Sequence, residues 1–254
     1  MSEIVSAAGS LVDRIKINAL SRELHEGRMM WVKRRRWTAG PIMACANVFF
    51  RLSGNPIIAL QEPTDWQRWE IDCFLRLHKQ EFRAFAVGDT AVAADELPGK
   101  SLSSHLSAGT LTEPMMRAAA RELRRAHEDW CPSFQASWSH GDPHSGNFIY
   151  ESDIDRARLI DFEVMHRPEL SAEERHADDL LIFLQDLVGR IAADRWLPLA
   201  HAFLAEYGRP EIVARLRPKL SVPGGFARIW WAVRTTYMGQ AELTRRIATL
   251  RDSL

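Results

Sequence analysis

The stretch "WSHGDPHSGNFIYESDIDRARLIDFEV", from Trp138 to Val164, decides how this sequence is interpreted. It places histidine, aspartate, asparagine and glutamate side chains around two short apolar runs, "NFIY" and "RLIDF". We expect both runs to be strands joined by a turn at "ESDIDR", because apolar runs bounded by turn-forming residues are typical of a β-hairpin. Asp161 interrupts the second run, and a buried carboxylate costs several kcal/mol unless it is paired or binds a metal. The stretch therefore predicts a hairpin that carries a functional site.

The composition is that of a globular protein without a dominant charge. The chain has 254 residues, with 33 Lys and Arg against 33 Asp and Glu. A neutral balance argues against a nucleic-acid-binding protein, which usually has a basic excess. The three cysteines, Cys45, Cys73 and Cys131, are far apart, which favours reduced thiols and a cytoplasmic location. No apolar run is long enough to span a membrane, and "MSEIVSAAGSLVDRIK" does not have the pattern of a signal peptide.

Outside the hairpin, the first third of the chain predicts mixed structure and the remainder predicts helices. Turns at Gly27 and at Gly88–Asp89 lie between apolar runs, so we expect two further hairpins. "TDWQRWEIDCFLRLHKQ" between them is expected to be a helix capped by Thr64 or Asp65. "PGKS", from Pro98 to Ser101, is the best candidate for a linker. The predicted helices beyond it are "EPMMRAAARELRRAHEDW", "RHADDLLIFLQDLVGRI", "RWLPLAHAFLAEYG" and "FARIWWAVRTTYMGQAELTRRIATL". The fold class is therefore expected to be α+β.

Three interpretations of the polar hairpin compete. The first is a solvated hairpin with incidental charge. The second is a metal-dependent hydrolase, since imidazoles and carboxylates at alternate strand positions can share one face. Its candidate ligands are His140, Asp142, His144, His176 and Asp178 or Asp179. Gly141 and Pro143 weaken this second interpretation because they break a regular strand.

The third interpretation is phosphoryl transfer. Asp142 lies in a loop, Asn147 follows five positions later, and Asp161 ends the next strand. Two oxygen ligands at the ends of a hairpin can hold Mg²⁺ against the phosphates of a nucleotide. A separate carboxylate on the loop can accept a proton from an attacking hydroxyl group.

"HGDPHSGNF" and "LIDFE" resemble the catalytic and metal-binding loops of the protein-kinase-like superfamily. Within it they are similar to the branch of aminoglycoside phosphotransferases, choline kinases and lipopolysaccharide-core sugar kinases. The resemblance implies a bilobal protein-kinase-like fold, with a small β-rich N-lobe over residues 1–97 and a mostly helical C-lobe over residues 98–254. It also implies a kinase that uses ATP and Mg²⁺ and transfers the γ-phosphoryl group to a hydroxyl of a small molecule, a sugar or a glycolipid.

The resemblance also implies roles for individual residues. Asp142 would be the catalytic base, and Asn147 and Asp161 would be the metal ligands. His140 would support the loop, whereas His144 and Glu163 have no implied role. Asp179, with Asp178 as the alternative, would anchor the backbone of the catalytic loop.

The nucleotide would be held by residues of the first part of the chain. Lys33 in "MMWVKRR" would contact the phosphates and would be oriented by Glu70, with Glu81 as a rival for that role. "AADELPGKSL" resembles a hinge between lobes, where backbone groups of Asp95, Glu96 and Leu97 would hold adenine. No glycine-rich phosphate loop precedes Lys33. Trp31, on the same strand face as Lys33, would narrow the adenine site.

The acceptor and two alternative functions stay open. An aminoglycoside acceptor would require acids near the cleft, for which Glu169, Glu173 and Glu174 are candidates. A lipopolysaccharide-type acceptor would bring the protein to the inner face of a membrane, where "KRRRW" and "RIWWAVR" are the candidates for peripheral contact. The alternatives are a Ser/Thr protein kinase and a pseudokinase that acts as a nucleotide-binding scaffold. The segment "VMHRPELSAEERHADD" is short for peptide docking and favours a small or lipid-linked acceptor.

Overall fold

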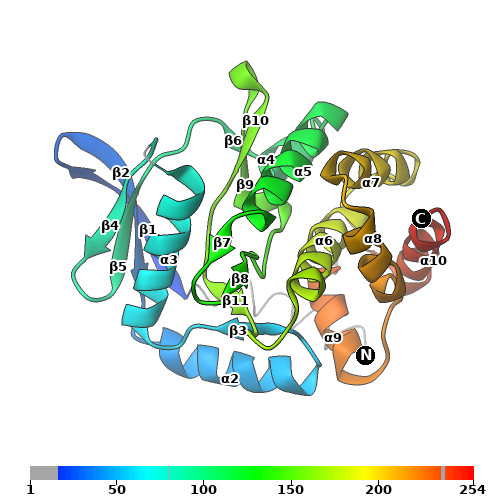
Figure 1. Cartoon of the computed structure of the whole chain (residues 1–254), viewed down its shortest axis with the longest axis horizontal. Coiled ribbons are helices and arrows are strands. Elements are labelled where there is room, and N and C mark those ends of the chain that lie inside the picture. The colour runs from blue at the N-terminus through cyan, green and yellow to red at the C-terminus, as the bar shows by residue number, and fades with distance from the viewer. Residues whose placement is uncertain (1–16, 80, 236–237) are drawn as a thin grey trace.

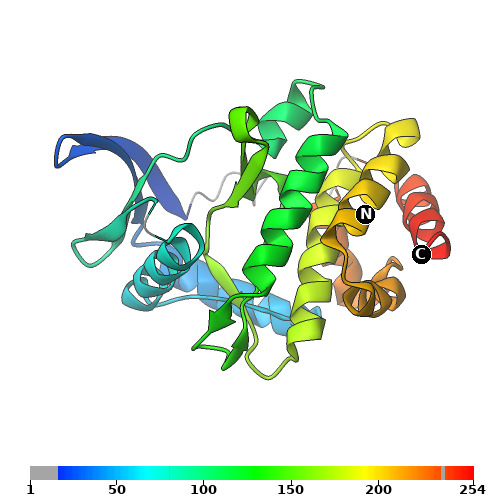
Figure 2. The ribbon, with the colours of Figure 1, turned by 45° about the horizontal axis from the view of Figure 1, so that its top comes forward.

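The computed structural model describes residues 17–79, 81–235 and 238–254 (Figure 1). The N-terminal segment in which no signal peptide was predicted, residues 1–16, lies outside this part of the chain. A small antiparallel sheet lies at one end of the molecule, most of the helices lie at the other end, and a β-hairpin runs between them (Figures 1 and 2). The predicted α+β class is confirmed, with strands concentrated in the first part of the chain and helices in the second.

Four strands form the N-terminal sheet. β1 (Asn18–His25), β2 (Arg28–Arg35), β5 (Ala91–Asp95) and β4 (Ala84–Val87) are adjacent in that order, and every neighbouring pair is antiparallel. Both hairpins predicted for this region are confirmed, with Gly27 and Gly88 in left-handed backbone conformations at the turns. Met30 and Val32 of β2 are buried on one face of the sheet, so Lys33 points to the other face.

Helix α3 (Pro63–His78) covers the face of the sheet that carries Lys33. Its apolar residues Trp66, Trp69, Phe74 and Leu77 are buried, as the helical spacing predicts. The predicted N-cap was wrong: the helix begins two or three residues earlier, after Glu62. The reason is Pro63, whose fixed backbone angle and missing N–H suit the first position of a helix.

A helix and a strand that the sequence did not reveal connect the N-terminal sheet with the rest of the molecule. α2 (Ala39–Leu52) is followed by β3 (Ile57–Ala59), which pairs with β11 (Val164–His166) directly after the polar hairpin. Phe49 and Phe50 of α2 contact the ring of Trp230, far along the chain. The boundary between residues 97 and 98 stays a prediction, since segments from both sides of it pack together.

The segment predicted as a linker forms a short strand, β6 (Lys100–Ser101), which adds to one side of the polar hairpin. The predicted hairpin is present and consists of β9 (Phe148–Glu151) and β10 (Arg156–Leu159). Its second strand lies earlier than the predicted run 158–162, so Asp161 follows the strand and does not end it. Gly99 has a φ angle of 110° and its Cα lies against the backbone of Tyr150. A side chain at this position would overlap the Tyr150 carbonyl oxygen and lie 2.6 Å from its carbonyl carbon.

Replacing Gly99 with alanine is therefore expected to destabilise the protein by about 1–3 kcal/mol, because backbone must move to admit the methyl group. Gly88→Ala is the matched control: Gly88 also has positive φ, but a Cβ there meets no atom within 4 Å. Urea unfolding of both variants measures the difference. Equal losses of stability would show that backbone conformation, and not the contact with Tyr150, governs position 99.

Helices make up most of the remaining chain. They are α4 (Leu102–Ser107), α5 (Glu113–His127), α6 (Ala172–Val188), α7 (Ala193–Tyr207), α8 (Pro210–Leu216), α9 (Gly225–Arg234) and α10 (Gln240–Asp252). A two-stranded ribbon of β7 (Trp130–Cys131) and β8 (Ala136–Ser137) follows α5. α5 and α6 lie side by side in Figures 1 and 2, and the core of the molecule is centred on them.

The last predicted helix is wrong as a single element. The chain leaves α9 at Thr235, whose dihedral angles are not helical, and α10 starts after Gly239 in an extended conformation. None of the helices in residues 17–79, 81–235 and 238–254 is long and apolar enough to cross a membrane.

Candidate active site

Lys33 brings together three acidic side chains from two distant parts of the chain. Its Nζ lies 3.0 Å from Glu70 Oε1 on α3 and 3.3 Å from Glu163 Oε1, and it donates a hydrogen bond to Asp161. Lys33 and Glu70 are the predicted pair. Glu81, the rival to Glu70, instead pairs with Arg156 and Arg158 at the surface.

The charges in this cluster depend on one another. Burial by itself would lower the pKa of Lys33, but Asp161, Glu70 and Glu163 raise it well above its usual value. Burial and the neighbouring Asp161 carboxylate raise the pKa of Glu163 to about 7. Lys33 is therefore charged at neutral pH, and Glu163 takes up a proton more easily than an exposed glutamate.

The segment that follows β10 is positioned by Glu70. Its Oε2 accepts a hydrogen bond of 3.1 Å from the backbone N–H of Phe162, while its other oxygen holds Lys33. Asp161 lies outside β10, which ends at Leu159, and has a φ angle of 70°. A non-glycine residue in this conformation is uncommon and is often found where a side chain must be aimed at a functional site.

Asp142 and Asn147 belong to one loop at the start of the hairpin. The Asn147 side chain donates a hydrogen bond of 2.9 Å through Nδ2 to the backbone carbonyl of Asp142. The backbone carbonyl of Asn147 accepts a bond from Ile160 N–H, next to Asp161. The loop and the segment after β10 are thus joined, so Asp142, Asn147 and Asp161 lie in one region with Lys33.

The histidines of the stretch have supporting positions. His140 contacts the Ile160 carbonyl through Nε2 at 3.1 Å, and its Nδ1 accepts a bond from Asp142 N–H. His144 caps the short helical turn Ser145–Asn147 by accepting a bond from Gly146 N–H. His140 thereby connects the two loops, and His144 shapes the turn that presents Asn147.

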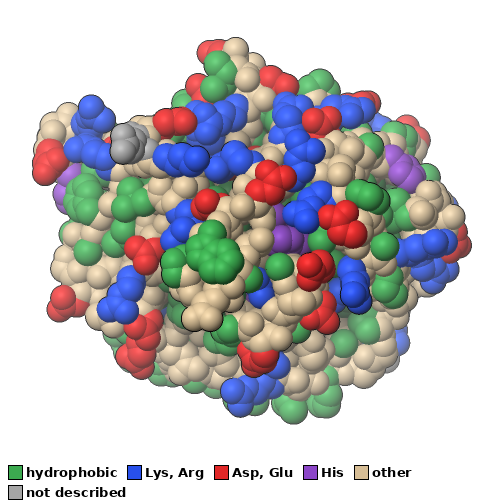
Figure 3. Space-filling model, viewed as in Figure 1, with side chains coloured by type: hydrophobic (Ala, Val, Ile, Leu, Met, Phe, Trp, Pro, Cys, Tyr) green, Lys and Arg blue, Asp and Glu red, His purple; other side chains and the backbone are tan. Residues whose placement is uncertain are grey.

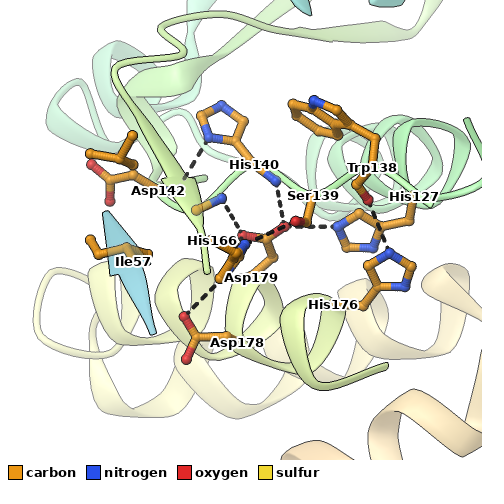
Figure 4. A network of polar contacts seen from close by, with 12 residues as sticks. Ile57, His127, Trp138, Ser139, His140, Asp142, His166, His176, Asp178 and Asp179 are labelled. Atoms are coloured by element: carbon orange, nitrogen blue, oxygen red, sulfur yellow. Dashed lines mark hydrogen bonds and ion pairs between the residues drawn. The ribbon is translucent and has the colours of Figure 1, made fainter. Parts of the chain in front are cut away.

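Asp179 on α6 anchors the loop from below (Figure 4). Its carboxylate accepts bonds of 2.8 Å from the backbone N–H groups of His140 and Gly141, and it lies 2.9 Å from His127 Nε2. Burial would raise the pKa of Asp179, but the neighbouring His166 and His127 hold it below its usual range. Asp178 contacts His166 instead, at 3.3 Å. Asp179 is therefore the residue that holds the loop backbone.

A second anchor was not predicted. Asp186 accepts a bond of 2.8 Å from the backbone N–H of Ser145, further along the same loop. Asp186 follows Asp179 by seven residues on α6, a spacing that places both carboxylates on one face of the helix. That spacing is visible in the sequence and could have revealed the second anchor.

Arg234, at the end of α9, reaches the Asp142 side chain, a contact that no sequence pattern indicated. Its Nη2 lies 2.9 Å from Asp142 Oδ1, and its guanidinium lies over the Trp230 ring at 4.6 Å. Burial would raise the pKa of Asp142, but Arg234 and the nearby histidines lower it. Asp142 is therefore ionised at neutral pH, as a proton acceptor must be.

The three residues predicted to line the adenine site, Asp95, Glu96 and Leu97, have different environments. The Asp95 N–H donates to the Arg83 carbonyl, and the Asp95 carboxylate accepts 2.8 Å from Arg83 N–H. Glu96 pairs with Arg22, whose guanidinium lies over the Trp31 ring, and Leu97 is buried. Asp95 therefore forms its hydrogen bonds with Arg83 inside the sheet. Arg22 and Glu96 lie beside Trp31, where the adenine site was predicted.

The ligand set of the metal-hydrolase interpretation is dispersed. His176 stacks on His127 and contacts the Trp138 carbonyl, and Asp179 is occupied by backbone N–H groups. In the described part of the chain, no group of three or more His, Cys, Asp or Glu side chains is arranged to hold a metal ion. The hairpin's polar residues instead converge on Lys33 and Asp142.

Comparison with protein-family models and with curated proteins gives no match. Many solved structures are distantly similar to this one, among them the following two. An ethanolamine kinase from Plasmodium vivax has a TM-score of 0.47 and 8% identity, and the alignment covers 97% of this chain and 84% of that one. An aminoglycoside-3'-phosphotransferase of type VIII has a TM-score of 0.45 and 16% identity, with coverage of 92% and 98%. At such distance, the activity of this chain has to be argued from its own side chains.

Proposed function

We propose that this protein is a protein-kinase-like phosphotransferase that uses ATP and Mg²⁺ to phosphorylate a hydroxyl group. The observation that carries the proposal is the convergence of Lys33, Glu70 and Asp161 beside the loop of Asp142 and Asn147. A cation for phosphates, oxygen ligands for a metal and a carboxylate base are the parts that phosphoryl transfer requires.

The residues present fit a magnesium site. Asn147 uses its Nδ2 on the Asp142 carbonyl, which fixes the amide orientation and directs its oxygen to a different partner. Asp161 provides a carboxylate whose pKa is lowered by Lys33 and the nearby histidines despite burial. Oxygen ligands of this kind suit Mg²⁺, which typically takes one or two protein groups together with phosphate oxygens. Asn147 and Asp161 would therefore hold the ion, which would neutralise charge on the phosphates.

The reaction follows from these positions. Lys33, held by Glu70, binds the nucleotide phosphates. The acceptor hydroxyl attacks the γ-phosphorus while Asp142 accepts its proton, a new O–P bond forms, and the bond to the β-phosphate oxygen breaks to release ADP. Without nucleotide, the Lys33 ammonium group pairs with Asp161. When nucleotide binds, the ammonium group would contact the phosphates in place of this carboxylate. Adenine would be held by backbone groups of Glu96 and Leu97.

Nucleotide binding tests the metal site. We expect ATP with Mg²⁺ to raise the Tm of the wild-type protein, and Asp161→Asn to abolish most of that rise because it removes the charged ligand. Asp153→Asn, in the exposed hairpin turn, is the matched control and should behave like the wild type. A thermal shift that needs no Mg²⁺, or that survives Asp161→Asn, would count against the proposal.

Arg234 supports an acceptor that carries an anionic group. Its positive charge adjoins the base, and a polycation such as an aminoglycoside would be repelled there. Of the acids considered for a cationic acceptor, Glu174 caps the start of α6 and Glu169 lies in a groove with Arg51 and Arg167. An anionic sugar or glycolipid headgroup could take the Arg234 guanidinium from Asp142 and leave the carboxylate open to the hydroxyl.

We expect Arg234→Gln to raise KM for anionic acceptors by about tenfold or more, because a hydrogen bond to a charged group is lost. ATP consumption is measured with matched neutral, phosphorylated and amino sugars, and Arg228→Gln on the same helix is the control. Uniform loss of activity across all acceptors would assign Arg234 to the support of Asp142. A preference for amino sugars would contradict an anionic acceptor.

Within the residues that the structure describes, no feature favours the alternative functions. Residues that a protein kinase would use for peptide docking form β11, which pairs with β3, and the capped start of α6. The four polar residues expected at a working site, Lys33, Asp142, Asn147 and Asp161, are present and mutually connected, which disfavours a pseudokinase. Autophosphorylation as a control in the acceptor screen separates these cases.

A further inference from the structure

Helices α2 and α9 form a basic and apolar outer surface, here called the α2–α9 face. The two helices are joined through Phe49, Phe50 and Trp230, and both lie along the lower edge of the molecule in Figure 1. On α2, the exposed residues Pro41, Cys45, Val48 and Leu52 recur at intervals of four, three and four, which places them on one side of the helix. Val48 on this side also lines a groove with Ile57 and Ile58 of β3.

Nearly half of the large exposed hydrophobic side chains of the described residues lie on this face. Five of the eleven lie on α2, on α9 or just before α2. They are Trp37 at 91% exposure, Leu52 at 61%, Val48 at 59%, Phe226 at 57% and Ile229 at 42%. Scattered apolar residues are normal on a protein surface, whereas a concentration of this kind marks a binding surface.

The two segments that build this face contain basic residues but no acidic ones. From Gly27 to Gln61 the chain has six Lys and Arg residues and no Asp or Glu, and from Ile212 to Ala241 it has five and none. The whole chain has 33 of each kind, so acids are missing only locally. Over much of the front surface in Figure 3, basic and acidic side chains are interspersed. Glu169, from another part of the chain, lines a groove with Val48 and Arg51, but the two segments themselves have no acid. Their charge is complementary to an anionic partner.

Several of these cations point outward. Arg36, Arg51 and Arg228 are exposed, and in the described part of the chain no carboxylate pairs with them. Lys33, Arg34 and Arg234 instead form ion pairs with acidic residues outside the two segments. Each outward arginine lies within two residues of an exposed apolar side chain: Arg36 next to Trp37, Arg51 next to Leu52 and Arg228 near Phe226. Positive charge and apolar surface therefore occur side by side.

We propose that the α2–α9 face docks on an anionic lipid bilayer. Apolar and tryptophan side chains on an exposed helix surface, flanked by arginines, can enter the headgroup region while the cations bind lipid phosphates. A second copy of this chain is disfavoured, because a symmetric interface would place this cationic face against itself. A nucleic acid would use the arginines but would leave Val48 and Leu52 without a partner.

This surface also bears on the proposed phosphotransfer. Phe226 and Arg234 lie at opposite ends of α9, about 12 Å apart at the rise of a helix. An acceptor held in a bilayer would therefore approach Asp142 from the docked side. This consequence rests on the proposed function, whereas lipid binding does not and is measured without ATP.

The test is sedimentation of the full chain with vesicles of phosphatidylcholine, with and without about a third phosphatidylglycerol. We expect binding to the anionic vesicles, weakened by salt. Arg51→Gln should reduce the partition coefficient about fivefold. Trp37→Ala and Leu52→Ser should each reduce it about tenfold. Arg68→Gln on α3 and Trp130→Ala on β7, both exposed residues of other elements, should leave it unchanged.

Three results would overturn the proposal. The first is no binding of the wild type to anionic vesicles at low salt. The second is binding that falls with the arginine change but not with the Trp37 and Leu52 changes, which would indicate a purely electrostatic polyanion site. The third is a concentration-dependent dimer, seen by light scattering and abolished by Leu52→Ser. Circular dichroism and Tm of each variant verify that these exposed substitutions leave the fold intact.

Discussion

Replacing Asp142 with asparagine is expected to lower the rate of phosphoryl transfer by a factor of about 10²–10⁴, the usual contribution of a general base. The carboxylate is ionised, because Arg234 and the nearby histidines together outweigh the effect of burial on its pKa. Asparagine has nearly the same shape but cannot accept the proton. The backbone carbonyl that holds Asn147 is retained, so the metal ligands keep their positions. The measurement is ATP turnover with the best acceptor from the sugar screen.

Binding separates a lost base from a damaged site. Asp142→Asn should keep the Mg²⁺-dependent thermal shift with ATP, whereas Asp161→Asn should lose it. Asp153→Asn should retain both turnover and binding. If Asp142→Asn retained more than about a tenth of the wild-type rate, another group would have to be the base.

The largest loss of stability is expected for Asp179→Ala, at about 3–5 kcal/mol. The substitution leaves the N–H groups of His140 and Gly141 and the His127 ring without their buried acceptor. Because the pKa of Asp179 is lowered in the folded protein, its contribution is present above the unfolded value and is lost only in acid. The stability difference from the wild type should therefore be constant between about pH 5 and pH 8.

Asp178→Ala is the matched control for Asp179→Ala. Asp178 is the preceding residue of the same helix, but it makes one contact of 3.3 Å with His166. Denaturant unfolding at neutral pH should show a much smaller loss for Asp178→Ala. Equal losses would mean that α6 requires both charges and that the bonds to the loop backbone contribute little.

Local patterns in the sequence were sufficient for much of the fold. The hairpins at Gly27 and Gly88, the helix around Glu70 and the polar hairpin β9–β10 are each specified by turn residues and apolar periodicity within short stretches. α2 and β3 were not predicted. α2 has an almost wholly apolar sequence without a clear alternation, and β3 is three residues long and exists only because β11 pairs with it.

The site was predictable to the extent that its residues lie in fixed motifs. The spacing of Asp142, Asn147 and Asp161 along the chain led to a common loop and hairpin. The pair of Lys33 and Glu70 was implied by the resemblance to kinases, which the order of a strand and a helix matched. The role of Asp186 could also have been predicted, from its spacing of seven residues after Asp179 on α6. Arg234 was not, because it comes from a helix about ninety positions later whose direction depends on the packing of Trp230 against α2.

The sequence by itself determined which chemical groups are available and which of them share a strand, a helix or a turn, since backbone geometry fixes those relations over a few residues. Only the tertiary structure decided which distant groups meet: Lys33 with Asp161, Asp179 with the backbone of His140, and Arg234 with Asp142. The physical reason is that these contacts depend on how whole elements pack. Packing is a property of many side chains together, and no local pattern encodes it.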